Sequence, residues 1–270
     1  MTTSTSQVLE FFKKIKLPAP DSHKGQNGKL LVIGGSELFH AAGKWSLDVA
    51  AKFVDMVFYS SVPSNNELIQ EAKQNFWNGI VVPQKDVEKY IEEADCVLIG
   101  PGMERSAETE KITNQLLKKY ANKKWVIDAG ALQMVDPSLL QTNHIITPHS
   151  REMKLLKEKA GNELSATVLL KGPIDIIRGA GQDLPAGRRE ITIEGGNAGM
   201  TKGGTGDVLA GLVAALYCLH DALTACVVAS YTNKKSGDYL YENVGPYFNA
   251  SDLAAAVPEV FWRKLQAIQK

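Results

Sequence analysis

The sequence predicts an α/β fold with a mostly parallel central sheet and helices on both of its faces. Most apolar runs are continuous rather than alternating, which is typical of strands buried on both faces. Segments with helical spacing separate most of these runs. Glycines and polar residues follow directly after several runs, at the edge where open α/β sheets bind their ligands.

The composition is that of one globular domain without a strongly charged partner. The chain has 270 residues, of which 44% are hydrophobic, and its 30 basic residues balance its 30 acidic residues. A balanced charge gives no electrostatic reason for nucleic acid or a membrane surface to be the main partner. We therefore expect a single domain over residues 1–270, with neither of these partners, and leave a homo-oligomer open.

The sequence has no recognisable targeting signal, so we expect the cytoplasm by default rather than from a positive signal. The N-terminal segment lacks the apolar stretch of a signal peptide, and no apolar run is long enough to span a membrane. The cysteines Cys96, Cys218 and Cys226 are scattered among apolar neighbours without the spacing of a zinc site. We interpret them as small core residues in a reducing compartment.

The first half of the chain alternates strands and helices. Apolar runs predict strands at residues 29–34, 54–59, 95–100, 125–128 and 144–147. Helical spacing predicts helices over residues 41–53 and 107–120, and from about residue 150 onward.

The second half changes from strands to helices. Strands are expected at residues 167–171 and 174–178 around a Lys-Gly-Pro turn, and a short one at 190–194. Residues 179–188 are polar and are expected to form a surface loop or hairpin connection. From Asp207 the pattern is helical to the end, with breaks predicted near Gly245-Pro246 and at Pro258.

Polar and glycine-bearing triplets follow several of the predicted strands. They are Gly34-Gly35-Ser36, Gly100-Pro101-Gly102, Asp128-Ala129-Gly130 and Thr147-Pro148-His149. Because the carboxyl ends of parallel strands meet at one edge of a sheet, these triplets predict a single site there.

A glycine-rich run precedes the most apolar helix of the chain. Residues 195–207, GGNAGMTKGGTGD, lead into residues 208–219, which are apolar almost all round. A buried helix of this kind places its unpaired N–H groups and positive dipole end inside the protein, where they can bind an anion. The Walker A pattern is absent from the sequence, so this is a different kind of phosphate loop.

Asp207 stands where that run meets the helix. It could cap the helix, since aspartate is a preferred capping residue. The surrounding glycines favour a catalytic role, because a carboxylate beside a phosphate loop can deprotonate an attacking hydroxyl.

Other polar motifs have a structural alternative beside the functional one. The sequence Thr147-Pro148-His149 with Glu152 could be only a strand end and the first turn of a helix, and Asp128 could cap the segment after it. Lys171-Gly172 could form a hairpin or place a lysine on a phosphate. Two further motifs could be simple turns or solvated loops: Gly100-Pro101-Gly102 and His23-Lys24-Gly25.

Taken together, these motifs resemble those of the ADP/ATP-dependent NAD(P)H-hydrate dehydratases, which have the ribokinase-like fold. The resemblance covers residue 17 to the C-terminus. Gly-Thr-Gly-Asp alone is shared by many ribokinase-like kinases, whereas its combination with the other motifs is far more specific. The motifs that carry the resemblance are His23-Lys24-Gly25, Gly34-Gly35-Ser36, Gly100-Pro101-Gly102, Asp128-Ala129-Gly130-Ala131-Leu132, Thr147-Pro148-His149-x-x-Glu152, Lys171-Gly172 and Asn197-Ala198-Gly199-Met200-x-x-Gly203-Gly204-Thr205-Gly206-Asp207.

The resemblance implies repair of hydrated NADH or NADPH. The family phosphorylates the hydroxyl of the hydrated nicotinamide ring with ADP or ATP and then eliminates phosphate. Asp207 would be the base and, with Ala42, Gly102 and His149, would line the hydrate site. Magnesium would bridge the phosphates without a dedicated set of protein ligands. The residues implied to bind the nucleotide are Lys171, Gly172, Pro173, Ile174, Asp175, Asn197, Gly203, Gly204, Thr205 and Gly206.

The chain departs from the family pattern at Ala41, Glu104 and Ser150-Arg151, all near the expected hydrate site. The epimerase domain often fused ahead of this one is missing, so we expect that activity from a separate chain, if at all. A ribokinase-like kinase of a small alcohol, such as a vitamin alcohol, is the first alternative. A catalytically silent nucleotide sensor is the second, and the presence of Asp207 counts against it.

Overall fold

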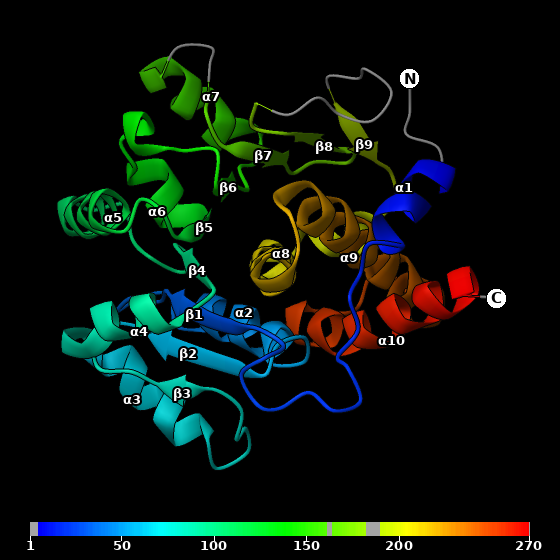
Figure 1. Cartoon of the computed structure of the whole chain (residues 1–270), viewed down its shortest axis with the longest axis horizontal. Coiled ribbons are helices and arrows are strands. Elements are labelled where there is room, and N and C mark those ends of the chain that lie inside the picture. Colours follow the sequence, from blue (N-terminus) through cyan, green and yellow to red (C-terminus); the bar gives the residue numbers. More distant parts are fainter. Residues whose placement is uncertain (1–4, 161–163, 182–189, 270) are drawn as a thin grey trace.

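A mostly parallel sheet forms the centre of the molecule. The computed structural model describes residues 5–160, 164–181 and 190–269 (Figure 1). Within them the strands are ordered β3-β2-β1-β4-β5-β6-β7-β8-β9. The pairs from β3 to β7 are parallel, and β8 is antiparallel to both β7 and β9. The strands are β1 Lys29–Ile33, β2 Met56–Ser60, β3 Ile80–Val81, β4 Cys96–Ile99, β5 Lys124–Ile127, β6 His144–Ile146, β7 Thr167–Leu170, β8 Asp175–Arg178 and β9 Ile191–Ile193.

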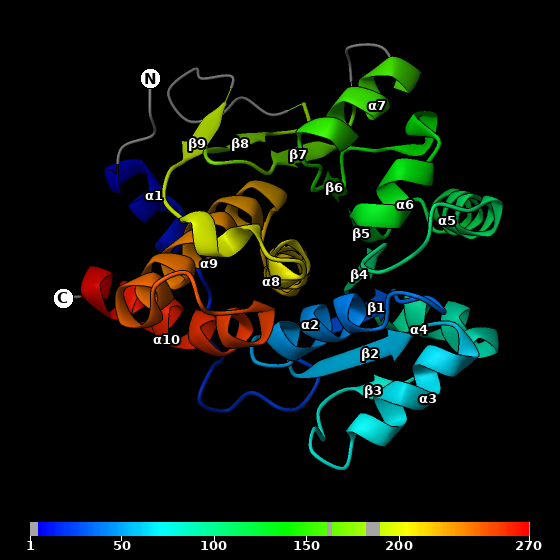
Figure 2. The same ribbon diagram turned by 180° about the vertical axis from the view of Figure 1, so that it is seen from behind.

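Helices cover both faces of this sheet. In Figures 1 and 2, α8 lies in the middle of one side, next to α2, α9 and α10, while α4 to α7 lie along the other side. The predicted α/β architecture with helices on both faces is confirmed. The helices are α1 Thr5–Phe12, α2 Ala41–Ala50, α3 Pro63–Ala72, α4 Val87–Glu93, α5 Ala107–Lys119, α6 Ala129–Met134, α7 Ser150–Ala160, α8 Thr205–Leu219, α9 Ala222–Val244 and α10 Ala250–Gln269, with short 3-10 helices at Gln84–Asp86, Pro137–Leu139 and Ala198–Thr201.

The continuous apolar runs are explained by two cores. Along β1, Leu30 and Val32 belong to the core shared with α8, whereas Leu31 and Ile33 belong to the core under α4 to α7. Successive side chains of a strand point to opposite faces, so a strand covered on both sides must be apolar at every position. The three cysteines are buried in the core shared with α8, in agreement with their interpretation as small core residues.

Several short elements escaped the sequence analysis. Helix α3 has the polar sequence PSNNELIQEA and buries few apolar side chains, so its helical spacing is weak. Three helices, α1, α4 and α6, and strand β3 are too short to show a clear hydrophobic period in the sequence. Most of the predicted polar loop at residues 179–188 lies outside the described residues.

The predicted break at Pro258 is wrong, because α10 continues through this proline. A proline inside a helix has no N–H, so the carbonyl four residues earlier loses its partner. That carbonyl belongs to Ala254, and it accepts a hydrogen bond from Lys52 Nζ of the segment after α2 at 2.7 Å. The other predicted break, at Gly245-Pro246, is confirmed between α9 and α10.

Among the described residues, no helix is long and apolar enough to cross a membrane.

Candidate functional site

The polar triplets after β1, β4, β5 and β6 meet at one edge of the sheet, as predicted. The residue after each strand donates its N–H to the last carbonyl of the neighbouring strand. Gly100 N donates to Ile33 O at 3.0 Å, and Asp128 N donates to Ile99 O at 3.0 Å. Thr147 N continues the series to Ile127 O at 3.2 Å. The carboxyl ends of β1, β4, β5 and β6 therefore lie side by side at this edge.

The N-terminus of α8 opens onto this edge. Gly204 is its N-cap with φ 96°, and a Cβ there would lie 2.4 Å from the Trp45 ring. Only glycine fits this conformation and this contact without strain. Thr205, Gly206 and Asp207 then form the first helical turn. The turn leaves N–H groups without intrahelical partners, which is the arrangement that binds anions.

The capping alternative for Asp207 is wrong, because Gly204 holds the N-cap position and α8 begins at Thr205. The helix starts earlier than the sequence predicted, and Asp207 lies inside its first turn. Its backbone carbonyl accepts from Ser46 Oγ at 2.8 Å, which ties this turn to α2.

A buried ion pair lies beside Asp207. Lys171, directly after β7, donates from Nζ to Asp128 Oδ1 at 2.7 Å. The side chains are 18% and 2% exposed, respectively. Burial alone would lower the pKa of Lys171, but the carboxylates of Asp128, Glu152 and Asp207 together raise it above its usual value. The surrounding carboxylates therefore favour the charged form of Lys171, and Asp128 is its charge partner rather than a side-chain cap of α6.

The electrostatics of this cluster set the protonation of Asp207. Burial, and then the neighbouring charge of Asp128, raise the pKa of Asp207 to about 7, with Glu152 acting in the same direction and Lys171 opposing. A carboxyl with a pKa near neutrality is suited to accept a proton in one step of a reaction and release it afterwards.

His149 and Glu152 form a reciprocal capping box at the start of α7. Glu152 Oε2 accepts from His149 N at 2.8 Å, while His149 Nδ1 accepts from Glu152 N at 3.2 Å. The motif therefore does form the first turn of a helix, which was its structural alternative. Glu152 nevertheless acts on the site, because its buried carboxylate contributes to the charges felt by Lys171 and Asp207. The sequence analysis did not assign it a role.

A cavity of about 580 Å³ lies in front of α8 and is lined by residues of the β7–β8 turn and of the segment 195–201. Of the residues implied to bind a nucleotide, it is lined by Lys171, Gly172, Pro173, Asp175, Asn197, Thr205 and Gly206. Ile174, Gly203 and Gly204 are outside its lining, and His149, expected at the hydrate site, is in it. Asn233 and Lys234 of α9 also line it and were missed, because they are hidden within a long helix.

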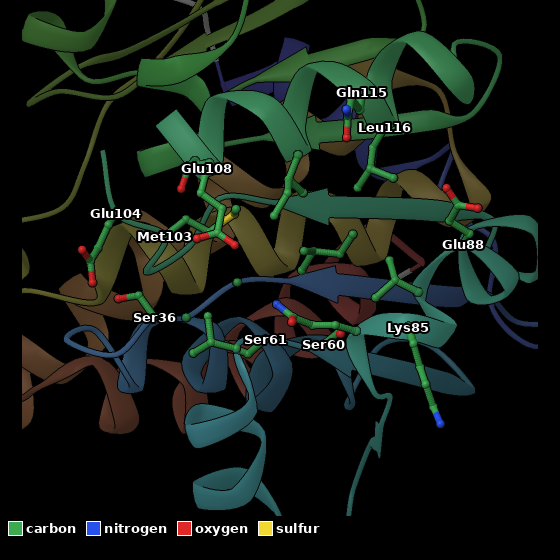
Figure 3. Close-up of a pocket in the computed structure, with 18 of the residues that line it drawn as sticks. Ser36, Ser60, Ser61, Lys85, Glu88, Met103, Glu104, Glu108, Gln115 and Leu116 are labelled. Carbon is green, nitrogen blue, oxygen red and sulfur yellow. The ribbon is translucent and has the colours of Figure 1, made fainter. Parts of the chain in front are cut away.

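A larger groove of about 810 Å³ lies at the same edge, between α4 and α5 (Figure 3). Its rim comes from the loops after β1 and β4, including Ser36, Met103 and Glu104. Ala42 and Gly102 meet beside this rim, since a Cβ on Gly102 would lie 3.1 Å from that of Ala42. The structure therefore brings Ala42 and Gly102 together, and places His149 on the wall of the other cavity.

The His23-Lys24-Gly25 motif lies away from this edge. Gly25 N donates to Asp55 Oδ2 at 2.8 Å, and Asp55 directly precedes β2 at the opposite end of the sheet. The segment is an exposed turn, in agreement with its structural alternative.

The chain matches the model of the protein family described as NAD(P)H-hydrate dehydratase over residues 30–259. It is 31% identical to the ADP-dependent (S)-NAD(P)H-hydrate dehydratase of Nitrosopumilus maritimus, over 96% of this chain and 95% of that protein. It is 35% identical to the bifunctional NAD(P)H-hydrate repair enzyme of Methanocaldococcus jannaschii, over 92% of this chain. The matched region makes up 51% of that relative, so the chain spans about half of its length.

Solved structures show the same fold. A ribokinase-like superfamily protein of Enterococcus faecalis superposes with a TM-score of 0.82 at 22% identity, covering 98% of this chain and 96% of that one. The ADP/ATP-dependent NAD(P)H-hydrate dehydratase of Bacillus subtilis, co-crystallised with ATP and magnesium, superposes with a TM-score of 0.76 at 20% identity, covering 98% and 99%. These likenesses confirm the ribokinase-like fold expected from the motifs.

Proposed function

The chain belongs to the NAD(P)H-hydrate dehydratase family, and from this premise we propose that it dehydrates hydrated NADH or NADPH with ADP or ATP as co-substrate. The observation that carries the proposal is the position of Asp207. Its carboxyl has a pKa near 7 and lies in the first turn of a buried helix whose N-terminus can bind phosphate. A base and an anion site are thus side by side, as phosphoryl transfer requires.

In the first step Asp207 accepts the proton of the ring hydroxyl. The hydroxyl oxygen forms a bond to the terminal phosphorus of the nucleotide, and the bond from that phosphorus to the bridging oxygen breaks. ADP would leave from ATP, or AMP from ADP. Negative charge on the phosphoryl oxygens is stabilised by the N–H groups of α8 and by Lys171, whose ammonium lies 3.5 Å from the Cβ position of Gly206.

In the second step the lone pair of the ring nitrogen forms a double bond to the carbon that bears the new phosphate. The carbon–oxygen bond breaks and inorganic phosphate leaves. Loss of a proton from the adjacent ring carbon then restores the dihydronicotinamide. The protein contributes positioning and phosphoryl transfer, and the electrons of the substrate drive the elimination.

Magnesium fits the residues around Lys171. Among the described residues no cluster of His, Cys, Asp or Glu could hold a metal ion by itself. Magnesium commonly binds through phosphates, water and one or two carboxylates. Asp128 and Glu152 would supply the carboxylates. When bound, the ion would neutralise charge on the transferred phosphoryl group.

The nucleotide is proposed to occupy the cavity of about 580 Å³, and the hydrated ring the space between Asp207, Ala42 and Gly102. The groove in Figure 3 begins at the same loops, so the rest of the dinucleotide would extend into it. The half-buried Glu104, one of the departures from the family pattern, lies on that path.

The proposal treats the chain as one dehydratase domain. The M. jannaschii relative, of which the chain spans about half, is named a bifunctional NAD(P)H-hydrate repair enzyme.

Incubation with hydrated NADH plus ADP or ATP tests the proposal. We expect the absorbance of dihydronicotinamide to recover only when nucleotide is present. The kinase alternative has the same cavity but no route to this recovery, and the match to relatives named as dehydratases supports the first function over it. No recovery with either nucleotide would reject the proposal.

A further inference from the structure

Helix α9 carries a lysine that is almost completely buried. The side chain of Lys234 is 6% exposed, and the residue lines the cavity of about 580 Å³ that we propose for the nucleotide. A buried charge is costly unless it is paired and hydrogen-bonded. The partners of Lys234 therefore show what this charge does.

The ammonium has a backbone carbonyl for each of its protons. Lys234 Nζ donates to Gly172 O at 2.9 Å, to Pro173 O at 3.1 Å and to Gly195 O at 3.2 Å. An ammonium has three donors and no acceptor, so the set is complete. The carboxylate of Asp175, 3.4 Å away, balances the charge.

Both carboxylate oxygens of Asp175 accept hydrogen bonds. Its Oδ1 accepts from Gly172 N at 2.9 Å, and its Oδ2 accepts from Ser230 Oγ at 2.7 Å. Ser230 lies one turn before Lys234 on α9, so a single helix surface holds both the cation and its counter-ion.

The carbonyls come from two segments that are far apart in the sequence. Gly172 and Pro173 form the turn between β7 and β8, and Gly195 follows β9. Both segments line the cavity of about 580 Å³ and each forms part of its wall. Carbonyl oxygens repel one another when they converge, so without a cation between them these two walls would separate.

We propose that Lys234 is a positioning residue of the nucleotide site, an internal cation that holds the two walls of the cavity at the spacing a nucleotide requires. The inference rests on the proposed function for the identity of the ligand. Stability alone explains the residue poorly, because replacing a buried ion pair with packed apolar groups is often neutral or stabilising.

The oxygens around the ammonium of Lys234 could also bind a small cation in its place. Carbonyl and carboxylate oxygens are ligands for hard cations as well as for an ammonium. If Lys234 is truncated to alanine, a small cation such as ammonium or potassium can occupy the vacated position. Methionine at this position fills the space of the side chain without a charge and leaves no room for the added ion.

The test compares Lys234→Ala and Lys234→Met with the wild-type protein by calorimetric titration of ADP and ATP. The matched control is Lys235→Ala, since Lys235 is the adjacent lysine, pairs with Asp238 at 3.0 Å and is more exposed. We expect the dissociation constant to rise at least about tenfold in both Lys234 variants, because one partner of a buried charge set is lost. The control should stay near the wild-type value.

Ammonium chloride, with sodium chloride at the same ionic strength as its control, should restore much of the affinity in Lys234→Ala and none in Lys234→Met. Unchanged affinity in both variants would overturn the inference, and so would a loss that ammonium does not restore in Lys234→Ala. Failure of both variants to fold would assign Lys234 to folding and also overturn it. If the wild-type protein itself bound neither nucleotide, the proposed function would fail, which is a distinct result.

Discussion

The ammonium of Lys171 lies 2.7 Å from Asp128 Oδ1, and both charges act on the carboxyl of Asp207 in the first turn of α8. The pair has two effects on Asp207, because Asp128 raises its pKa while Lys171 lowers it. A phosphate that draws Lys171 away from Asp128 would change both effects at once. In the proposed reaction, nucleotide binding would thus be coupled to the protonation of Asp207.

Replacing Asp207 with asparagine should nearly abolish turnover. The amide keeps the size of the side chain but cannot accept the hydroxyl proton, and loss of a general base typically costs on the order of a hundredfold or more. Nucleotide affinity should remain close to the wild-type value, because the N–H groups of α8 are unchanged. Steady-state kinetics and calorimetry measure the two quantities. Asp21→Asn, at an exposed position, is the control, and near-normal turnover in Asp207→Asn would refute its role as the base.

The rate should fall at acid pH with an apparent pKa near 7 in kcat/KM. In the proposed reaction the ionised form of Asp207 is the base, and its pKa is raised to about 7, so the active form is lost below this value. Asp128→Asn removes a negative neighbour and frees Lys171, so the acid limb should move to lower pH. A pH–rate profile of both proteins checks this, and an acid limb that does not move in Asp128→Asn would contradict it.

The raised pKa of Asp207 also affects stability. Its contribution to stability should fall as pH rises, whereas activity should increase. The pKa of Asp207 is raised on folding from its ordinary value of 3.8, so the folded protein prefers the protonated form. Its contribution is fully present below pH 3.8 and is lost as pH rises through about 7. Relative to Asp207→Asn, the free energy of unfolding of the wild-type protein should therefore decrease over this interval in denaturant titrations.

Activity should require magnesium, although the protein alone should bind it weakly. The carboxylates near Lys171 are too few to form a complete site, so most ligands must come from phosphate and water. Excess chelator should stop turnover, and added magnesium should restore it. Full activity in chelator would contradict this account, and so would one tightly bound ion per chain in the absence of nucleotide.

Lys52→Met should destabilise the fold without affecting the site. The carbonyl of Ala254 has lost its helical partner to Pro258 and accepts from Lys52 Nζ at 2.7 Å. An unsatisfied buried acceptor costs about 1–3 kcal/mol. Denaturant unfolding of Lys52→Met and of Lys111→Met, an exposed lysine of α5, measures the difference. Equal stability of the two variants would show that the Ala254 carbonyl finds another partner.

The sheet could be predicted from sequence because its signal is local. Apart from the two-residue β3, the strands were marked by apolar runs, and polar triplets marked where several of them end, so the convergence of Gly100, Asp128 and Thr147 followed from topology alone. The start of α8 was predicted too late, because glycines are poor helix formers and the first turn consists partly of them.

Interactions between distant segments could not be read from the sequence. The bond from Lys52 to Ala254 joins residues 202 positions apart, and it gives a partner to the carbonyl that Pro258 leaves without one in α10. Lys234 gave no sequence signal for the same reason, because its carbonyl partners lie 39 to 62 positions away. The role of Glu152 was hidden by its match to an ordinary capping pattern.

The fate of the transferred phosphate tests the central claim most directly. The protein is incubated with hydrated NADH and ATP labelled in the terminal phosphate, and the label is followed together with the dihydronicotinamide absorbance. We predict that labelled inorganic phosphate appears in step with dihydronicotinamide and that no phosphorylated dinucleotide accumulates. Label retained in a stable phosphoester, without recovery of dihydronicotinamide, would contradict the dehydratase account and identify a kinase instead.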